Sequence, residues 1–207
     1  MDDVTAFVLA GGKSLRMGTD KALLPLGSET LLQRALRIAG AVCPKPMILA
    51  DSGSYASFGD VIEDRMPGCG PLGGIHAALC VTKSDRNLIL SAEMPLMTSE
   101  FLRWLVSLAS NDDTLATVPQ PGARNQPLCA VYRREMLPVI ERALAAGECK
   151  VDRIFAQVPT RYLSDSEIRT AGFNEDIFAN INTPEEYEGL QRRFASDALA
   201  GSQGSRR

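Results

Sequence analysis

The segment from Leu9 to Lys21, Leu-Ala-Gly-Gly-Lys-Ser-Leu-Arg-Met-Gly-Thr-Asp-Lys, combines residue types that bind anions. The adjacent glycines Gly11 and Gly12 allow backbone N–H groups to approach an anion closely. Arg16 can bind a phosphate through two parallel hydrogen bonds, and Lys21 can add a point charge. The segment has neither Walker A nor G-x-G-x-x-G spacing, so a solvated glycine loop is the alternative interpretation.

A second glycine-rich segment covers residues 64–75 and contains a literal G-x-G-x-x-G at Gly68, Gly70 and Gly73. Pro71 inside the motif, and the lack of a long strand directly before it, argue against a dinucleotide fingerprint. An oxidoreductase with a Rossmann fold is therefore a minor alternative. A turn with so few side chains lets a flat base or a ribose lie against the backbone.

The elements that must position these loops follow from hydrophobic periodicity, because short apolar runs alternate with longer amphipathic segments. The expected strands are residues 4–10, 47–50, 61–62, 87–91, 114–118, 128–132, 161–163 and 177–180. The expected helices are residues 30–42, 74–81, 99–110, 134–146, 151–157 and 183–194. This alternation predicts an α/β fold with three layers, in which helices cover both faces of a mostly parallel central sheet. Ligands of such sheets bind beyond the carboxyl ends of the strands, where both glycine-rich segments are expected.

The length of 207 residues favours a single domain, which we place at residues 1–195, followed by a flexible tail at 196–207. The 22 basic and 25 acidic side chains give a net charge of −3, which argues against a nucleic-acid partner. No apolar run approaches the ~18 residues of a membrane span, so no membrane partner is expected. The acidic start is unlike a secretory signal.

The cysteine and histidine content excludes several kinds of site. Five cysteines without a C-x-x-C pair indicate neither a disulfide framework nor a zinc knuckle, and a reducing cytoplasm is the expected location. His76 is the single histidine, so a multi-histidine metal site has no basis, and we interpret His76 as structural.

The pattern Leu-Ala-Gly-Gly-x-Ser-x-Arg-Met-Gly-x-Asp-Lys resembles the opening signature of the molybdenum cofactor guanylyltransferases. These enzymes, the family of molybdopterin-guanine dinucleotide biosynthesis protein A, belong to the sugar-nucleotide-transferase-like superfamily. The resemblance implies a Rossmann-like nucleotidyltransferase fold. It also implies that the loop binds the nucleoside triphosphate: Leu9 and Ala10 would border guanine, Gly11 and Gly12 would give backbone contacts, and Arg16 and Lys21 would bind the phosphates as catalytic residues.

The second segment is similar to the family's Asp-x-x-x-Gly-x-Gly-Pro-Leu stretch, which lines the nucleotide pocket. The resemblance therefore implies nucleotide-binding roles for Asp64, Gly70, Pro71 and Leu72. In the family, the neighbourhood of Asp51 reads the guanine edge. A carboxylate there could accept hydrogen bonds from both guanine N1–H and N2–H, although a role in capping its own loop is equally open.

Glu93 occupies the position before Met-Pro where relatives carry an aspartate that holds Mg²⁺. Glutamate is also a hard oxygen ligand, but its extra methylene moves the carboxylate, and errors of about 1 Å can cost ~100-fold in rate. The resemblance also makes Asn182 a candidate for binding the metal or the acceptor, with capping of the next helix as the alternative. Asn180 and Arg124 are candidate acceptor contacts, and Arg124 could equally be a solvated loop residue.

The activity implied by the resemblance is transfer of GMP from GTP to molybdopterin or its molybdenum form, with pyrophosphate as the second product. Molybdoenzymes or their chaperones would be the partners that receive the product. Two alternatives stay open. One is a cytidylyltransferase of the same family, and the other is a weakened or non-catalytic module that binds nucleotide or cofactor, because Glu93 replaces the family aspartate.

Overall fold

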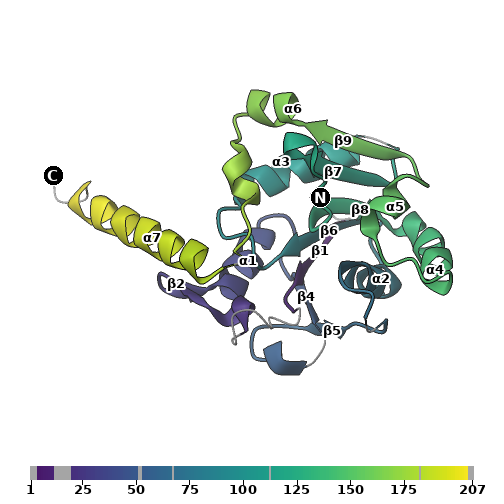
Figure 1. Ribbon diagram of the computed structural model, residues 1–207, viewed down its shortest axis with the longest axis horizontal. Helices are drawn as coiled ribbons and strands as arrows, with labels where there is room; N and C mark the ends of the chain where they lie inside the picture. Colours follow the sequence, from purple (N-terminus) through teal and green to yellow (C-terminus); the bar gives the residue numbers. More distant parts are fainter. Residues whose placement is uncertain are drawn as a thin grey trace.

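The computed structural model describes residues 4–11, 20–50, 53–66, 68–111, 113–181 and 183–204, and it places seven strands in one central sheet (Figure 1). The strand order is β5-β4-β1-β6-β8-β7-β9. The strands are β1 (Val4–Leu9), β4 (Met47–Ala50), β5 (Val61–Glu63), β6 (Arg86–Ser91), β7 (Ala116–Gln120), β8 (Cys129–Arg133) and β9 (Thr160–Ser164). A separate two-stranded hairpin joins β2 (Pro25–Leu26) and β3 (Glu29–Thr30).

Helices connect most of these strands. The α-helices are α1 (Leu31–Ala39), α2 (Pro71–Val81), α3 (Ser99–Ser110), α4 (Leu137–Ala145), α5 (Val151–Phe155), α6 (Asp165–Thr170) and α7 (Pro184–Gly204). The 3-10 helices are η1 (Lys21–Leu23), η2 (Gly53–Tyr55), η3 (Pro121–Ala123), η4 (Arg134–Met136) and η5 (Glu175–Phe178). Within the described residues, no helix combines the length and the apolar character that crossing a bilayer requires.

The sheet is mostly parallel, as predicted. Strand β1 pairs in parallel with both β4 and β6, and β9 pairs in parallel with β7, whereas β8 runs antiparallel to β6 and β7. Leu9 at the end of β1 is in register with Leu49 of β4 and with Ser91 of β6. The loops after these three strands therefore leave the sheet side by side at one edge.

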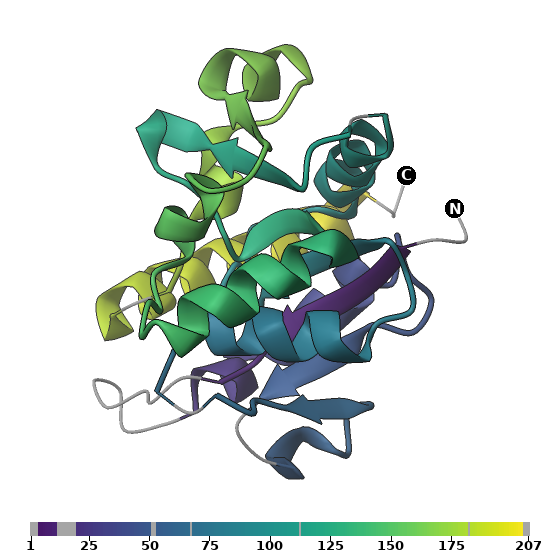
Figure 2. The ribbon, with the colours of Figure 1, turned by 90° about the vertical axis from the view of Figure 1, so that its right-hand side faces the viewer.

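Both faces of the sheet are buried, which confirms the three-layer prediction. Along β1, Phe7 packs with the apolar side chains of α2, α4 and α5, whereas Ala6 and Val8 pack with those of α1 and α3. Figure 2 shows α2 and α4 in front of the sheet. Because successive strand residues point to opposite faces, an apolar residue at every position is what a sheet covered on both sides requires.

Capping residues explain where two helices begin. Thr30 Oγ1 accepts a hydrogen bond from the Gln33 N–H (3.2 Å), and the Gln33 side chain accepts one from the Thr30 N–H (2.8 Å). Thr183 and Glu186 form the same reciprocal pair at the start of α7, with distances of 3.1 and 3.2 Å. Both starts are where the sequence places them, since these side chains satisfy N–H groups that the first turn leaves unpaired.

Two sequence-based expectations about elements are wrong, and other elements were not expected. Residues 177–180 do not form a strand, because Asn174 caps the 3-10 helix η5 and the side chains of Ile177 and Phe178 are buried in the core. Helix α7 does not end at residue 194 but continues to Gly204, and Figure 1 shows it extending away from the body of the protein. Helix α6 and the β2–β3 hairpin were not expected. The division into a domain at 1–195 and a flexible tail stays a prediction.

The cysteines correct another expectation. The structure joins Cys69 to Cys149 as a disulfide, with the two Cα atoms 4.9 Å apart and a sequence separation of 80. The remaining cysteines, Cys43, Cys80 and Cys129, are free. A cysteine count contains no information on which side chains the fold brings together, so this pair could not be inferred from sequence.

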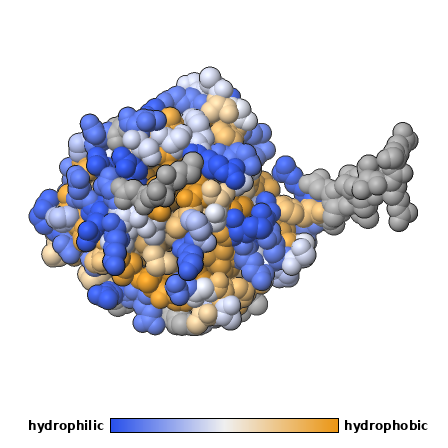
Figure 3. Space-filling model, turned by 180° about the vertical axis from the view of Figure 1, so that it is seen from behind, coloured by the Kyte–Doolittle hydropathy of each residue, from blue (hydrophilic) through white to orange (hydrophobic). Residues whose placement is uncertain are grey.

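The surface is mixed in character. Figure 3 shows hydrophilic side chains interspersed with hydrophobic ones over the face seen from behind. Among the described residues, the large hydrophobic side chains classed as exposed are Leu23 and Tyr162.

Candidate functional site

The first glycine-rich loop begins between two neighbouring strands. The Ala10 N–H donates to Leu49 O (2.9 Å), and the Ala92 N–H donates to Leu9 O (3.0 Å). Ala10 is buried and Leu9 half-buried, whereas Gly11 is exposed at the start of the loop. These bonds place the loop at the edge where β1, β4 and β6 end. Gly12 and Arg16 lie outside the described residues.

Lys21 and Glu93 meet at this edge. Lys21 Nζ donates to Glu93 Oε2 at 3.3 Å and to the backbone oxygen of Ile181 at 3.0 Å. The side chains of Lys21 and Glu93 are 13% and 32% exposed. The pair therefore lies at the surface of the fold, within reach of a ligand, and not in its core.

The backbone holds Glu93 in place. The Glu93 N–H donates to Ser91 Oγ at 3.1 Å, and the Ile181 N–H donates to Glu93 O at 3.3 Å. Glu93 Oε1 accepts no hydrogen bond from the described residues, which leaves it available to a cation. Asn182 lies outside the described residues. Asn180 is exposed and follows the 3-10 helix η5, whereas we expected it at the end of a strand.

Contacts at the start of η1 hold the segment that carries Lys21. Asp20 Oδ1 accepts from the Ala22 N–H (3.0 Å), and Asp20 Oδ2 accepts from the Tyr55 hydroxyl (2.6 Å). Tyr55 is only 5% exposed and comes from η2, in the segment after β4. Tyr55 could not be predicted from the sequence, because a lone tyrosine in a polar loop belongs to no motif. Asp51, in the same segment, lies outside the described residues.

The second glycine-rich loop depends on its glycines. Gly68 and Gly70 have φ angles of +93° and +54°, a backbone conformation that residues with a side chain rarely adopt. A Cβ added to Gly73 would lie 2.7 Å from Asp64 Oδ1, and that oxygen already accepts from the Met66 N–H (2.7 Å). The half-buried Asp64 carboxylate is therefore fixed between its own loop and the first turn of α2.

The other two residues expected in this loop differ in what they can offer a ligand. Pro71 is exposed at the first position of α2. Leu72 is fully buried in the core between the sheet and α2, so only its backbone remains available to a nucleotide.

Arg124 lies in the loop between β7 and β8. Because β7 is parallel to β6, this loop leaves the sheet at the same edge as Glu93, and Leu128 O accepts from the Ser91 N–H at 2.7 Å. Gly122 and Ala123 both have positive φ angles, so the loop has a strained, specific shape. The Arg124 side chain is exposed and forms no hydrogen bond with Lys21, Glu93 or another described residue.

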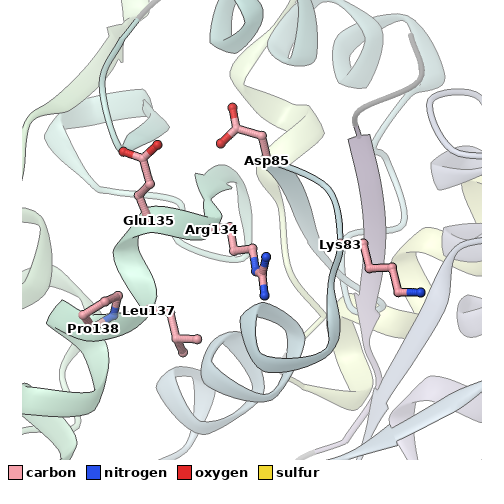
Figure 4. Close-up of a pocket in the computed structure, with 6 residues that line it drawn as sticks. All are labelled: Lys83, Asp85, Arg134, Glu135, Leu137 and Pro138. Atoms are coloured by element: carbon pink, nitrogen blue, oxygen red, sulfur yellow. The ribbon is translucent and has the colours of Figure 1, made fainter.

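A hollow shown in Figure 4 lies at the opposite edge of the sheet and is not part of this site. Its lining residues are Lys83, Asp85, Arg134, Glu135, Leu137 and Pro138. The Arg134 N–H donates to Asp85 O at 2.8 Å, next to the first residue of β6.

Comparison with known proteins identifies the family of this chain, and the match includes both glycine-rich loops. Residues 6–162 match the family model described as the MobA-like NTP transferase domain. This chain belongs to the MobA-like NTP transferase family. A relative from Carboxydothermus hydrogenoformans, named probable molybdenum cofactor guanylyltransferase, is 32% identical over 94% of this chain and 98% of its own length. A relative of the same name from Pelotomaculum thermopropionicum is 35% identical over 90% of this chain and 91% of its own.

A solved structure has the same fold. The crystal structure of molybdopterin-guanine dinucleotide biosynthesis protein A from Archaeoglobus fulgidus superposes with a TM-score of 0.80 at 23% identity, covering 93% of this chain and 99% of that one. This likeness confirms the predicted nucleotidyltransferase fold, whereas the family assignment rests on the matching family model and the two relatives.

Proposed function

We propose that this MobA-like transferase moves GMP from GTP to the terminal phosphate of molybdopterin or its molybdenum form. The observation that carries the proposal is the convergence of Lys21 and Glu93 at the edge where two glycine-rich loops begin. The guanylyltransferase names of relatives that match nearly the whole chain support the choice of substrates.

The chemistry requires alignment and charge neutralisation more than proton transfer. The acceptor is a phosphate monoester whose second pKa lies near ~6, so it is largely a dianion at pH 7. One of its oxygens attacks the α-phosphorus of GTP, the bond from that phosphorus to the β-phosphate oxygen breaks, and pyrophosphate leaves. Lys21 leaves its partner Glu93 to bind the triphosphate, with Arg16 as the second cation. No histidine is needed as a base.

Replacing the Lys21–Glu93 contact by a contact with phosphate is energetically feasible. Ion pairs between partly exposed side chains typically contribute about 0–1 kcal/mol. The side chains of this pair are 13% and 32% exposed, and the carbonyl oxygen of Ile181 holds the lysine in place while its partner changes. The lysine is thus already positioned before substrate binds.

The donor set at this edge fits Mg²⁺, which usually takes one or two carboxylates together with substrate phosphates. Glu93 would hold the ion through Oε1, and Asn182 is the second proposed ligand. When bound, Mg²⁺ neutralises charge on the phosphates and on the departing pyrophosphate.

The remaining residues would bind the two substrates. Leu9, Ala10 and the backbone of Gly11 and Gly12 would border the nucleotide. Its guanosine would lie against Asp64 and the Gly70–Leu72 turn, with Asp51 at the guanine edge. Arg124 and Asn180, both exposed at loops outside the Lys21–Glu93 pair, would contact the acceptor. Molybdoenzymes or their chaperones would receive the product.

The test is pyrophosphate release with each of GTP, CTP, ATP and UTP, in the presence of Mg²⁺ and molybdopterin, against a control without acceptor. We expect release with GTP only, and only with acceptor. Turnover of CTP in place of GTP would overturn the guanine choice and identify a cytidylyltransferase. Binding of GTP without pyrophosphate release would overturn the enzymatic proposal and identify a binding module.

A further inference from the structure

A second group of potential metal ligands lies between α2 and α4, on residues that the nucleotide reaction does not use. His76 and Cys80 stand four residues apart on α2, so they share one face of the helix. Glu141 projects from α4 toward the same point. Cys80 Sγ lies 3.4 Å from His76 Nε2, and Glu141 Oε1 lies 3.9 Å from the same nitrogen.

The spacing between Cys80 and His76 matches a tetrahedral zinc site, whereas Glu141 Oε1, on a 55% exposed side chain 3.9 Å from His76 Nε2, would have to move closer to bind. Bonds of about 2.3 Å to sulfur and 2.0 Å to nitrogen, at a tetrahedral angle, place those ligand atoms about 3.5 Å apart. The observed separation is 3.4 Å, and all three ligand atoms lie within 4.8 Å of one another. We propose that His76, Cys80 and Glu141 bind one Zn²⁺, with water as the fourth ligand.

The charges and ligand types select the ion. A thiolate and a carboxylate together neutralise a divalent cation, so the bound site carries no net charge. Thiolate and imidazole favour zinc over magnesium, which prefers oxygen ligands. The competing interpretation is a set of simple polar contacts from His76 to Cys80 and to Glu141, which requires no metal and predicts no zinc binding.

Burial holds the His76 ring in place, but the ring nitrogen that would not bind zinc lacks a hydrogen-bond partner in the described part of the chain, which limits the affinity for zinc. The His76 side chain is 12% exposed, and Nδ1 is buried without a hydrogen-bond partner among the described residues. Zinc ligation through Nε2 would leave the proton on Nδ1 without an acceptor. Since partners of that kind typically contribute 10–100-fold in metal affinity, we expect this site to bind about that much more weakly than supported histidine sites.

The proposed ion would join two helices and would lie away from the phosphates. Helix α2 starts at Pro71, directly after the second glycine-rich loop, and Cys80 stands about 13 Å along the helix axis at 1.5 Å per residue. Zinc would cross-link α2 to α4 and would thereby restrict the motion of the helix that begins at the Gly70–Leu72 turn. This inference stands whether or not the chain transfers GMP.

The first experiment is zinc binding to the full chain, stripped of metal and kept reduced. Zn²⁺ is titrated against a chromogenic chelator, with excess Mg²⁺ present to occupy Glu93. We expect one zinc per chain, with at least about 10-fold weaker binding for Cys80→Ser and His76→Gln. Glu141→Gln, at a 55% exposed position, should weaken binding less. Cys43→Ser is the matched control and should bind as the unaltered chain does.

Co²⁺ provides an independent readout that does not depend on activity. The unaltered chain and Cys43→Ser should show a thiolate-to-cobalt charge-transfer band, and Cys80→Ser should not. A Cys149→Ser variant should keep the band, because the proposed thiolate ligand is Cys80 and neither Cys69 nor Cys149 is part of the site. Wild-type zinc affinity in a folded Cys80→Ser variant, checked by far-ultraviolet circular dichroism, would overturn the proposal, as would loss of the cobalt band in Cys149→Ser.

Discussion

Lys21 Nζ lies 3.3 Å from Glu93 Oε2, although 72 residues separate the two side chains in sequence. The same nitrogen donates to Ile181 O, and the Ile181 N–H donates to Glu93 O. A cation from the first loop and a carboxylate from the end of β6 are thereby held together by a third segment. This arrangement places a cation and a carboxylate side by side at the edge of the sheet where the glycine-rich loops begin.

Replacing Lys21 by alanine should remove most turnover and leave the fold intact. A positioned charge on a developing anion typically contributes about 100- to 1,000-fold to rate, whereas a partly exposed ion pair contributes about 0–1 kcal/mol to stability. Pyrophosphate release and thermal unfolding measure the two effects. Lys83→Ala, at an exposed position at the opposite edge, is the control. Pyrophosphate release at the rate of the unaltered chain by Lys21→Ala would remove Lys21 from the mechanism.

Shortening Glu93 to aspartate should raise activity or tighten Mg²⁺ binding. The change introduces the aspartate that the family resemblance implies at this position, and it withdraws the carboxylate by one methylene, which also lengthens its 3.3 Å contact with Lys21. Measured Mg²⁺ dependence of pyrophosphate release reports both effects, and Glu93→Gln should require far more Mg²⁺. If aspartate changes neither the rate nor the Mg²⁺ requirement, position 93 does not hold the metal.

The sequence predicted the parts of this fold that local patterns encode. Unbroken apolar runs predicted strands buried on both faces, and Thr30 and Thr183 marked helix starts through hydrogen bonds within one turn. The strand predicted around Ile177 and Phe178 is wrong because a short apolar pair packs into a core equally well from a strand or from a 3-10 helix. Periodicity alone does not distinguish the two.

The site was predictable only in part, for a physical reason. Glycine and charge patterns identified the loops, and because both loops follow strands of a predicted parallel sheet, they were expected at the same edge. The contact of Tyr55 with Asp20, the pairing of Cys69 with Cys149 and the cluster around His76 each join segments far apart in sequence. No local pattern contains such pairings, because they arise only from packing.

Placing alanine at Gly73 should damage nucleotide binding. Its Cβ would lie 2.7 Å from Asp64 Oδ1, so the carboxylate or the start of α2 must move, at a cost of about 1–3 kcal/mol in stability. The KM for GTP should rise more than kcat falls. Gly189→Ala is the matched control, because nothing lies within 4 Å of that position in α7. An unchanged KM in Gly73→Ala would separate Asp64 from the nucleotide site.

Replacing Cys149 by serine should lower stability only under oxidising conditions. The Cys69–Cys149 bond closes a loop of 80 residues, and constraint of the unfolded chain by such a loop is worth up to about 4 kcal/mol. Chemical denaturation with and without a reductant measures this contribution. The variant and the unaltered chain should differ without reductant and coincide with it, whereas Cys43→Ser should match the unaltered chain in both. A difference that persists in reductant would assign the loss to packing.

Acid should weaken the attachment of the β2–β3 hairpin to α1 through Glu29. A hydrogen bond from Arg37 is the largest cause holding the pKa of Glu29 below its ordinary value of 4.5, with Arg34 adding to it against the opposing effect of burial. A carboxyl group with a lowered folded-state pKa contributes stability above its ordinary pKa and loses it as the pH falls through the folded value. The unaltered chain should therefore be more stable than Glu29→Gln at pH 7, and the difference should shrink steadily below pH 4.5. Urea unfolding at a series of pH values measures it, and a difference independent of pH would show that the Glu29 charge does not hold the hairpin.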